Sequence, residues 1–132
     1  MLLVETYIDH SPVEGIGLFA AEDIPKGTII WRFNSVVDQI IEPAEVLKLP
    51  EATRHFLEKY ASLSPQIGKI VLCGDNDRFT NHSYTPNRHC IIEEQTGEVI
   101  EIAACDIKKG EELTNDYREI DANFDSYADE LR

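Results

Sequence analysis

The chain of 132 residues has few cations and few cysteines. Twelve Lys and Arg stand against 25 Asp and Glu, so the net charge is −13 and the basic face of a nucleic-acid binder is missing. No apolar run approaches the ~20 residues of a membrane span. The first residues also lack the basic region of a secretory signal. Three widely spaced cysteines exclude a disulfide framework and favour a reducing, intracellular setting.

Several motifs that carry common chemistries are also missing. The sequence has no GxxxxGK[ST] phosphate loop, no GxSxG elbow and no HExxH helix. The pair Gly15 and Gly17 lacks the third glycine of a dinucleotide-binding turn. His82, His89 and Cys90 do not give a four-ligand pattern, so no metal site is predicted. The length and the 42% apolar content predict one globular domain over residues 1–132.

Short strands separated by turn residues are predicted along most of the chain. Helices are predicted over 43–49 and 51–62, and the spacing of Ile120, Phe124, Tyr127 and Leu131 predicts a terminal amphipathic helix. The strands are expected at 2–8, 15–20, 28–33, 69–73, 89–93 and 99–103, the last two joined by a loop that contains a glycine. These elements indicate a mainly β fold of small, mostly antiparallel sheets with short helices.

Two polar clusters stand out against these apolar segments. The first is Arg78-Phe-Thr-Asn-His-Ser-Tyr-Thr-Pro-Asn87, and the second is Gly110-Glu-Glu-Leu-Thr-Asn-Asp-Tyr117. A tight series of turns would account for the proline and the last asparagine of the first cluster. It accounts less well for Arg78, Phe79, Asn81 and His82, which are large side chains, most of them with directional hydrogen bonds.

Together with Glu14-Gly-Ile-Gly-Leu-Phe-Ala20, these clusters closely resemble the SET domain of protein-lysine methyltransferases, in order and spacing, from about residue 5 to 117. The resemblance implies a β-rich SET fold of the β-clip type, with a C-terminal pseudoknot. The core is then 5–117 and a helical tail occupies 118–132.

The resemblance also implies an activity, the transfer of a methyl group from S-adenosylmethionine to a lysine amine. Tyr117 matches the catalytic tyrosine of the family. Tyr60 matches a tyrosine at the junction of cofactor and lysine, although a core tyrosine fits as well. The implied cofactor-binding residues are Glu14, Gly15, Ile16, Gly17, Arg78, Phe79, Asn81 and His82.

The sequence departs from the family pattern near its end. Tyr84 stands where many relatives have a zinc-binding cysteine, and no cysteine follows Cys105, so no zinc module is predicted after the domain. The chain looks like a minimal, stand-alone SET protein of the bacterial or viral kind. Phe124 and Tyr127 either close the lysine channel or only pack the tail. Glu119 replaces a frequent aromatic residue, which leaves the number of transferred methyl groups open.

The acidic charge fits a basic partner, or else only keeps the protein soluble. Glu93, Glu94, Glu98 and Glu101 share the predicted hairpin with no Lys or Arg, and we expect them to steer a basic peptide. The expected substrate is a lysine in a basic protein or peptide, histone or other, with the enzyme as monomer or homodimer. The expected compartment is the cytoplasm in a bacterium and the nucleus in a eukaryotic cell. The alternatives are a catalytically weak SET binding module and a structural domain without cofactor.

Overall fold

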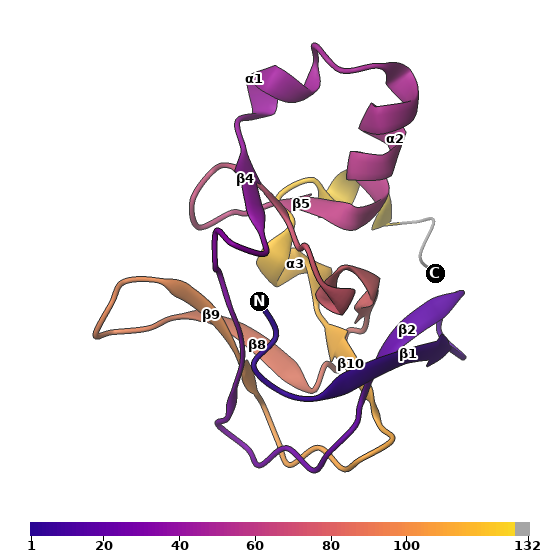
Figure 1. Cartoon of the computed structure of the whole chain (residues 1–132), viewed down its shortest axis with the longest axis vertical. Coiled ribbons are helices and arrows are strands. Elements are labelled where there is room, and N and C mark those ends of the chain that lie inside the picture. Colours follow the sequence, from indigo (N-terminus) through magenta and orange to yellow (C-terminus); the bar gives the residue numbers. More distant parts are fainter. Residues whose placement is uncertain (129–132) are drawn as a thin grey trace.

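The computed structural model describes residues 1–128 and contains three small sheets with short helices (Figure 1). The first sheet has the order β1-β2-β10-β7. Its strands are β1 (Thr6–His10), β2 (Ile16–Ala20), β10 (Glu112–Asn115) and β7 (Asn81–His82). The β1–β2 and β2–β10 pairs are antiparallel, whereas β10 and β7 run parallel. The mainly β fold of small sheets is therefore confirmed, with one parallel pair at the centre of the polar clusters. The first strand, predicted over 2–8, forms later in the chain, at Thr6–His10.

The second sheet is built on the predicted hairpin. Strand β9 (Val99–Ala103) lies between β3 (Ile29–Arg32) and β8 (Arg88–Ile92). The hairpin loop contains Gly97 with φ of 71°, a conformation that favours glycine. Trp31, Glu101 and Cys90 lie opposite one another across the three strands, so their side chains share one face.

The third sheet carries the helices on its outer side (Figure 1). Strand β6 (Ile70–Leu72) pairs with β4 (Gln39–Ile41) and β5 (Ala61–Leu63), and helices α1 (Pro43–Val46) and α2 (Glu51–Tyr60) lie between β4 and β5 in the chain. The helices predicted over 43–49 and 51–62 form over shorter ranges, and residues 61–62, which were predicted as helix, belong to β5. Strand β4 is too short to give a strand pattern. Leu57 of α2 is buried as expected, whereas Phe56 remains 40% exposed.

The hydrophobic core joins the first two sheets. It is formed by Leu18, Ala20, Ile24, Ile30, Ala103, Ile107 and Leu113. Two similar turns meet in it, because the backbones of Ile24 and Ile107 bond each other in both directions at 2.7 and 2.8 Å. This core fixes β2, β9 and β10, the strands that carry or flank the polar clusters.

The end of the chain differs from the single amphipathic helix predicted from its spacing. Two short helices form instead, α3 (Tyr117–Ile120) and the 3-10 helix η2 (Phe124–Ser126). Asp121 is extended and nearly buried, and its carboxylate accepts from the backbone N–H of Asn123 and of Leu63, which ends α3. Leu131 lies outside the described residues. No helix within 1–128 is long and apolar enough to cross a membrane.

The first polar cluster wraps the second. It forms the 3-10 helix η1 (Asn76–Phe79), strand β7 and a loop. The Asn87 amide donates to Glu112 O at 2.8 Å and accepts from Thr114 N at 3.0 Å, and Ser83 N donates to Asn115 O at 2.9 Å. These bonds hold β10 in the region where the resemblance places the pseudoknot.

Candidate functional site

A cleft of about 290 Å³ lies between the second and third sheets. The cleft is lined by residues of both sheets, of η1 and of α3. Its apolar lining includes Trp31, Phe33, Ile40, Val71 and Ile120, and its polar lining includes Asp77, Thr80, Glu101, Asn115 and Tyr117. The lining thus offers apolar surface to a hydrocarbon chain and hydrogen-bonding groups beside it, as where Trp31 lies directly opposite Glu101 on neighbouring strands.

Tyr117 stands at the junction of β10 and α3. The preceding Asp116 caps α3 by accepting from Arg118 N, which fixes the backbone at the tyrosine. The Tyr117 hydroxyl donates to Thr80 O at 2.5 Å, and its backbone N donates to His82 Nδ1 at 3.0 Å. Burial, followed by the negative charges of Glu14 and Asp77, raises the pKa of Tyr117. The phenol is therefore neutral at physiological pH.

Asn81 connects the three motifs of the resemblance. Its amide nitrogen contacts Glu14 O at 3.2 Å, Ile16 O at 3.3 Å and Glu112 Oε2 at 2.9 Å. Gly17 packs so closely that a Cβ there would lie 2.5 Å from Glu112 Oε2. The glycine strand, the Asn-His pair and β10 consequently meet at one place, as the resemblance implies.

Gly15 leaves open space beside this strand. Its φ of 45° lies in the left-handed region, and a Cβ there would meet no atom within 4 Å. Glycine at this position lets another molecule approach the backbone closely.

An aromatic cluster surrounds His82. The rings of Tyr84, Phe124 and Tyr117 lie 4.3, 5.1 and 5.2 Å from its ring. Burial lowers the pKa of His82, so the ring is neutral, and Nδ1 accepts from Tyr117 N, which places the proton on Nε2. Phe124 and Tyr127 pack on this cluster and against each other at 5.7 Å. They are not among the residues that line the cleft, so their role in binding a substrate remains a prediction.

A second group of rings holds Tyr60 in the cleft wall. Its ring lies 5.1 Å from Phe56 and 5.8 Å from Phe79, and the Arg78 guanidinium lies 5.6 Å from the Phe56 ring. Arg78 also donates to Cys73 O at 2.9 and 3.1 Å. Tyr60 and Arg78 line the cleft, whereas Phe79, whose ring packs on Tyr60, does not.

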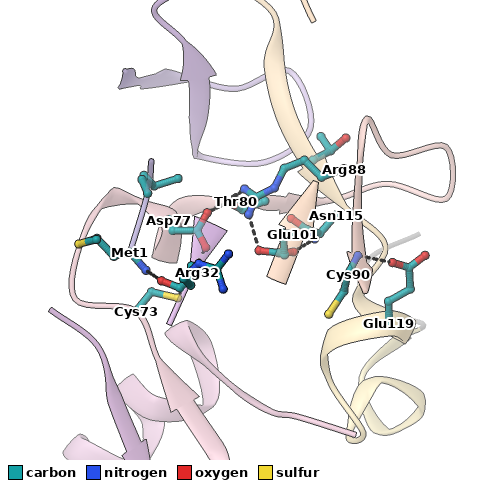
Figure 2. A network of polar contacts seen from close by, with 12 residues as sticks. Met1, Arg32, Cys73, Asp77, Thr80, Arg88, Cys90, Glu101, Asn115 and Glu119 are labelled. Atoms are coloured by element: carbon teal, nitrogen blue, oxygen red, sulfur yellow. Dashed lines mark hydrogen bonds and ion pairs between the residues drawn. The ribbon is translucent and has the colours of Figure 1, made fainter. Parts of the chain in front are cut away.

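Sequence reasoning missed a buried ionic network behind this wall (Figure 2). Arg88 is fully buried, its NH1 contacts Asp77 Oδ1 at 2.7 Å, and its NH2 donates to Glu101. Glu101 in turn accepts from the Asn115 amide. Burial raises the pKa of Glu101 despite these donors. The hairpin register, which puts Arg88 diagonal to Glu101, was the signal that could have revealed the pair.

The hairpin acids are not a free negative strip, so that expectation was wrong. Arg32 of the neighbouring β3 donates to Glu93 at 2.9 and 2.8 Å and to Glu98 at 2.6 Å. These hydrogen bonds from Arg32 lower the pKa of Glu93 to about 2. Glu101 is paired with the buried Arg88, and of the four hairpin acids only Glu94 has no ion pair among residues 1–128.

Glu119, which stands where the family often has an aromatic residue, ties α3 to β8. It accepts from Cys90 N at 3.1 Å and contacts His89 Nδ1 at 3.2 Å. Within residues 1–128, no three His, Cys, Asp or Glu side chains are grouped to hold a metal ion. Burial raises the pKa of Cys73 and raises that of Cys90 to about 12, so neither thiol is a ready nucleophile.

Comparison with known proteins gives a consistent result. The SET domain family model matches residues 15–118. Human histone-lysine N-methyltransferase 2D is 29% identical over 118 residues, which are 85% of this chain and 2% of that protein. A Mycosarcoma maydis histone-lysine N-methyltransferase described as H3 lysine-36 specific is 32% identical over 137 residues, covering 98% of this chain and 13% of that protein. The chain thus spans only a small part of the length of these relatives.

Solved structures share the fold. Chaetomium thermophilum Polycomb Repressive Complex 2 superposes with a TM-score of 0.69 at 25% identity, covering 96% of this chain and 17% of that chain. A Plasmodium falciparum protein superposes with a TM-score of 0.60 at 23% identity, and there the match covers 88% of this chain and 95% of the other. With the family model matched over most of the sequence and the three motifs brought together in space, the chain belongs to the SET domain family.

Proposed function

We propose that the chain is a protein-lysine N-methyltransferase that uses S-adenosylmethionine and acts on a lysine of a basic protein or peptide. The observation that carries the proposal is the Tyr117 hydroxyl, bonded to Thr80 O in a cleft lined by both apolar and polar side chains. The relatives that the chain resembles are histone-lysine methyltransferases, which supports the reaction class. A Polycomb complex of the same fold, 24% identical, is known in a structure bound to S-adenosylmethionine.

The residues of this chain fit the cofactor at two points. The open space beside Gly15 adjoins the strand whose carbonyls are held by Asn81. His82 Nε2 is a buried N–H donor with no partner among residues 1–128, and such donors usually bond a ligand or a water. Glu14, Gly15, Ile16, Asn81 and His82 would hold the cofactor, which supplies a methyl group on a positively charged sulfur.

The chain itself prepares the lysine amine. A free lysine has a pKa near 10.4, and the nitrogen must lose a proton before it can attack. Burial among the apolar side chains of the cleft lowers the pKa of an inserted lysine and favours the neutral amine.

Tyr117 orients that amine. Because its hydroxyl donates to Thr80 O, the phenolic oxygen keeps its lone pairs as acceptors. It can therefore take one N–H of a neutral amine and direct the nitrogen lone pair. Alignment of this kind contributes up to about 7–11 kcal/mol to a two-reactant step.

The direct test is methyl transfer to a mixture of core histones and to an array of lysine-containing peptides. Mass spectrometry should find one added CH₂ per transferred methyl group, and calorimetry should find binding of S-adenosylmethionine. Heat of binding without transfer would favour the binding-module alternative, and neither signal would favour a structural domain.

The variant Tyr117→Phe distinguishes a catalytic role of the Tyr117 hydroxyl from a structural role of the side chain. Loss of one positioned hydroxyl at a reacting centre costs about 100–1,000-fold in rate. We expect that loss with nearly unchanged cofactor affinity, because the phenol ring and its contact with His82 remain. Tyr7→Phe, on exposed β1, is the matched control and should keep full activity. A joint loss of binding and transfer in Tyr117→Phe would assign the tyrosine a structural role instead.

A further inference from the structure

The buried Arg88 network reaches Tyr117 by a continuous set of contacts. Arg88 NH1 lies 2.7 Å from Asp77 Oδ1 and 3.2 Å from Thr80 Oγ1, and Thr80 Oγ1 lies 3.2 Å from the same carboxylate oxygen. These three polar groups form a closed triangle in the cleft wall (Figure 2). Because one corner of the triangle is a fully buried arginine, the three groups have little freedom to move.

Thr80 is fixed at every polar group. Its hydroxyl belongs to the triangle, its backbone N donates to Asp77 O at 3.1 Å, and its carbonyl accepts from Tyr117. The bonds of the Thr80 hydroxyl and N–H hold its Cα, and the pairing of Asn81 with Thr114 holds the other side of the Thr80–Asn81 peptide, so the carbonyl has little freedom to turn. The position of the Tyr117 hydroxyl therefore depends on the triangle.

A second arm of the network reaches the backbone next to Tyr117. Arg88 NH2 donates to Glu101, and Glu101 accepts from the side chain of Asn115, two residues before the tyrosine. The Asn115 carbonyl also accepts from Ser83 N at 2.9 Å. Arg88 thus supports Tyr117 both at its hydroxyl and through β10.

Stability alone does not explain a buried arginine here. Ion pairs of this kind are often replaced by apolar side chains with no loss of stability, because burying the charges offsets their attraction. Precise positioning of a hydroxyl is a separate requirement that a buried arginine can meet. A displacement of about 1 Å at a reacting centre can lower the rate about 100-fold.

We propose that Arg88 is a positioning residue for methyl transfer, which acts through Asp77 and Thr80 to place the Tyr117 hydroxyl. This inference rests on the proposed function. It predicts that loss of the triangle lowers kcat while the affinity for S-adenosylmethionine stays the same, because Arg88 touches neither Asn81 nor the glycine strand in any hydrogen bond among residues 1–128.

The mildest test is Thr80→Val, which removes only the hydroxyl and keeps the carbonyl that bonds Tyr117. We expect kcat to fall about tenfold, and Thr80→Ser, which restores the hydroxyl, to recover most of it. Thr6→Val on β1 is the matched control and should match the wild type. Equal kcat values for Thr80→Val and the wild type would overturn the proposal.

A double-mutant cycle tests whether Arg88 acts through the tyrosine. Arg88→Lys keeps the charge but loses the forked contacts to Asp77 and Glu101, so kcat should fall in the wild-type background. In the Tyr117→Phe background the same change should have little further effect, because the group it positions is gone. An equal loss in both backgrounds would show that Arg88 serves only the fold.

A spectroscopic readout keeps this inference separate from the proposed function. With ¹³Cζ-labelled tyrosine, the Tyr117 resonance can be assigned by its absence in Tyr117→Phe. Thr80→Val should shift it, while the Tyr7 resonance should stay in place. If the wild type transfers no methyl group, the proposed function fails, and the resonance still decides whether the triangle positions Tyr117. An unshifted resonance would overturn that role.

Discussion

Two arginines of this protein each bridge two carboxylates, one inside the molecule and one at its surface. The Arg88 side chain has no exposed surface and lies between Asp77 and Glu101, which are 7% and 8% exposed. Arg32 is 29% exposed and lies between Glu93 and Glu98. Each bridge pairs one guanidinium with two carboxylates, so the largest difference between the two is burial.

Burial changes what each bridge can do. A surface pair is weakened by water and by salt, and it adds little to stability. A buried pair gains a strong attraction but also a large desolvation penalty, so breaking it costs much more than its net contribution. The inner bridge therefore resists movement beside Tyr117, while the outer one mainly removes negative charge from the hairpin.

The two glutamates record this difference in opposite pKa shifts. Burial raises the pKa of Glu101, whereas hydrogen bonds from Arg32 lower the pKa of Glu93 to about 2. Folding therefore favours the protonated form of the first and the ionised form of the second.

The largest expected effect comes from breaking the inner bridge. Arg88→Met leaves two buried carboxylates unpaired and should lower the free energy of unfolding by about 3–5 kcal/mol. Urea denaturation followed by circular dichroism measures it. A loss below about 1 kcal/mol would mean that water reaches the site and that the two bridges are alike.

A triple variant serves as the control for that experiment. Combining Arg88→Met with Asp77→Asn and Glu101→Gln removes all three charges together and should recover much of the lost stability. Its methyl transfer should remain low, because the triangle that holds Thr80 is gone.

Glu101→Gln should have a smaller effect, of about 1–3 kcal/mol, because it leaves hydrogen-bonding groups in place. The Asn115 amide can turn so that its unpartnered Oδ1 accepts from the new Gln. The wild type should lose stability as pH rises from about 4.3 through the raised pKa of Glu101, because the folded state binds the extra proton. The variant should lack this fall, and an unchanged slope would assign it to another group.

Local patterns predicted most of the fold. The hairpin, both helices and the strand that contains Gly15 and Gly17 follow from apolar spacing and turn residues, which act over a few positions. The prediction of one helix in the tail was wrong, because the Asp121 carboxylate accepts from the backbone N–H of Leu63, far away in the sequence, and ends the helix. Strand β4 was missed because three residues carry too little pattern, and β5 was missed because the helical spacing before it was extended through residue 62.

Site residues could be predicted from the sequence only where they belong to contiguous motifs. The two clusters predicted Asn81, His82 and Tyr117, and the structure brings Asn81 to Glu14 and Tyr117 to His82. Their roles in binding and catalysis stay predictions. Arg88 was missed because alternation along a strand does not tell which charged residue is covered from both sides. Its partner Glu101, between two isoleucines, was expected on the surface for the same reason.

The outer bridge should be nearly dispensable for stability. Arg32→Met should shift the urea midpoint far less than Arg88→Met, and the remaining effect should vanish at 1 M salt, where the Debye length is about 3 Å. Methyl transfer to a basic peptide should rise, because Glu93 and Glu98 lose their cation. An effect as large as that of Arg88→Met would show that the bridges are equivalent despite their exposure.

The smallest expected effect is on the acid side of the stability curve. The pKa of Glu93 is lowered to about 2, so between that value and about 4.3 the unfolded state binds the extra proton. The stabilisation by the Arg32 pair is then present above pH 4.3 and is lost as pH falls through about 2. Glu93→Gln should flatten this part of the curve and leave the fall caused by Glu101 at higher pH. Denaturation midpoints from pH 2 to 7 measure both slopes, and the same slope in variant and wild type would show that Arg32 does not hold Glu93 in solution.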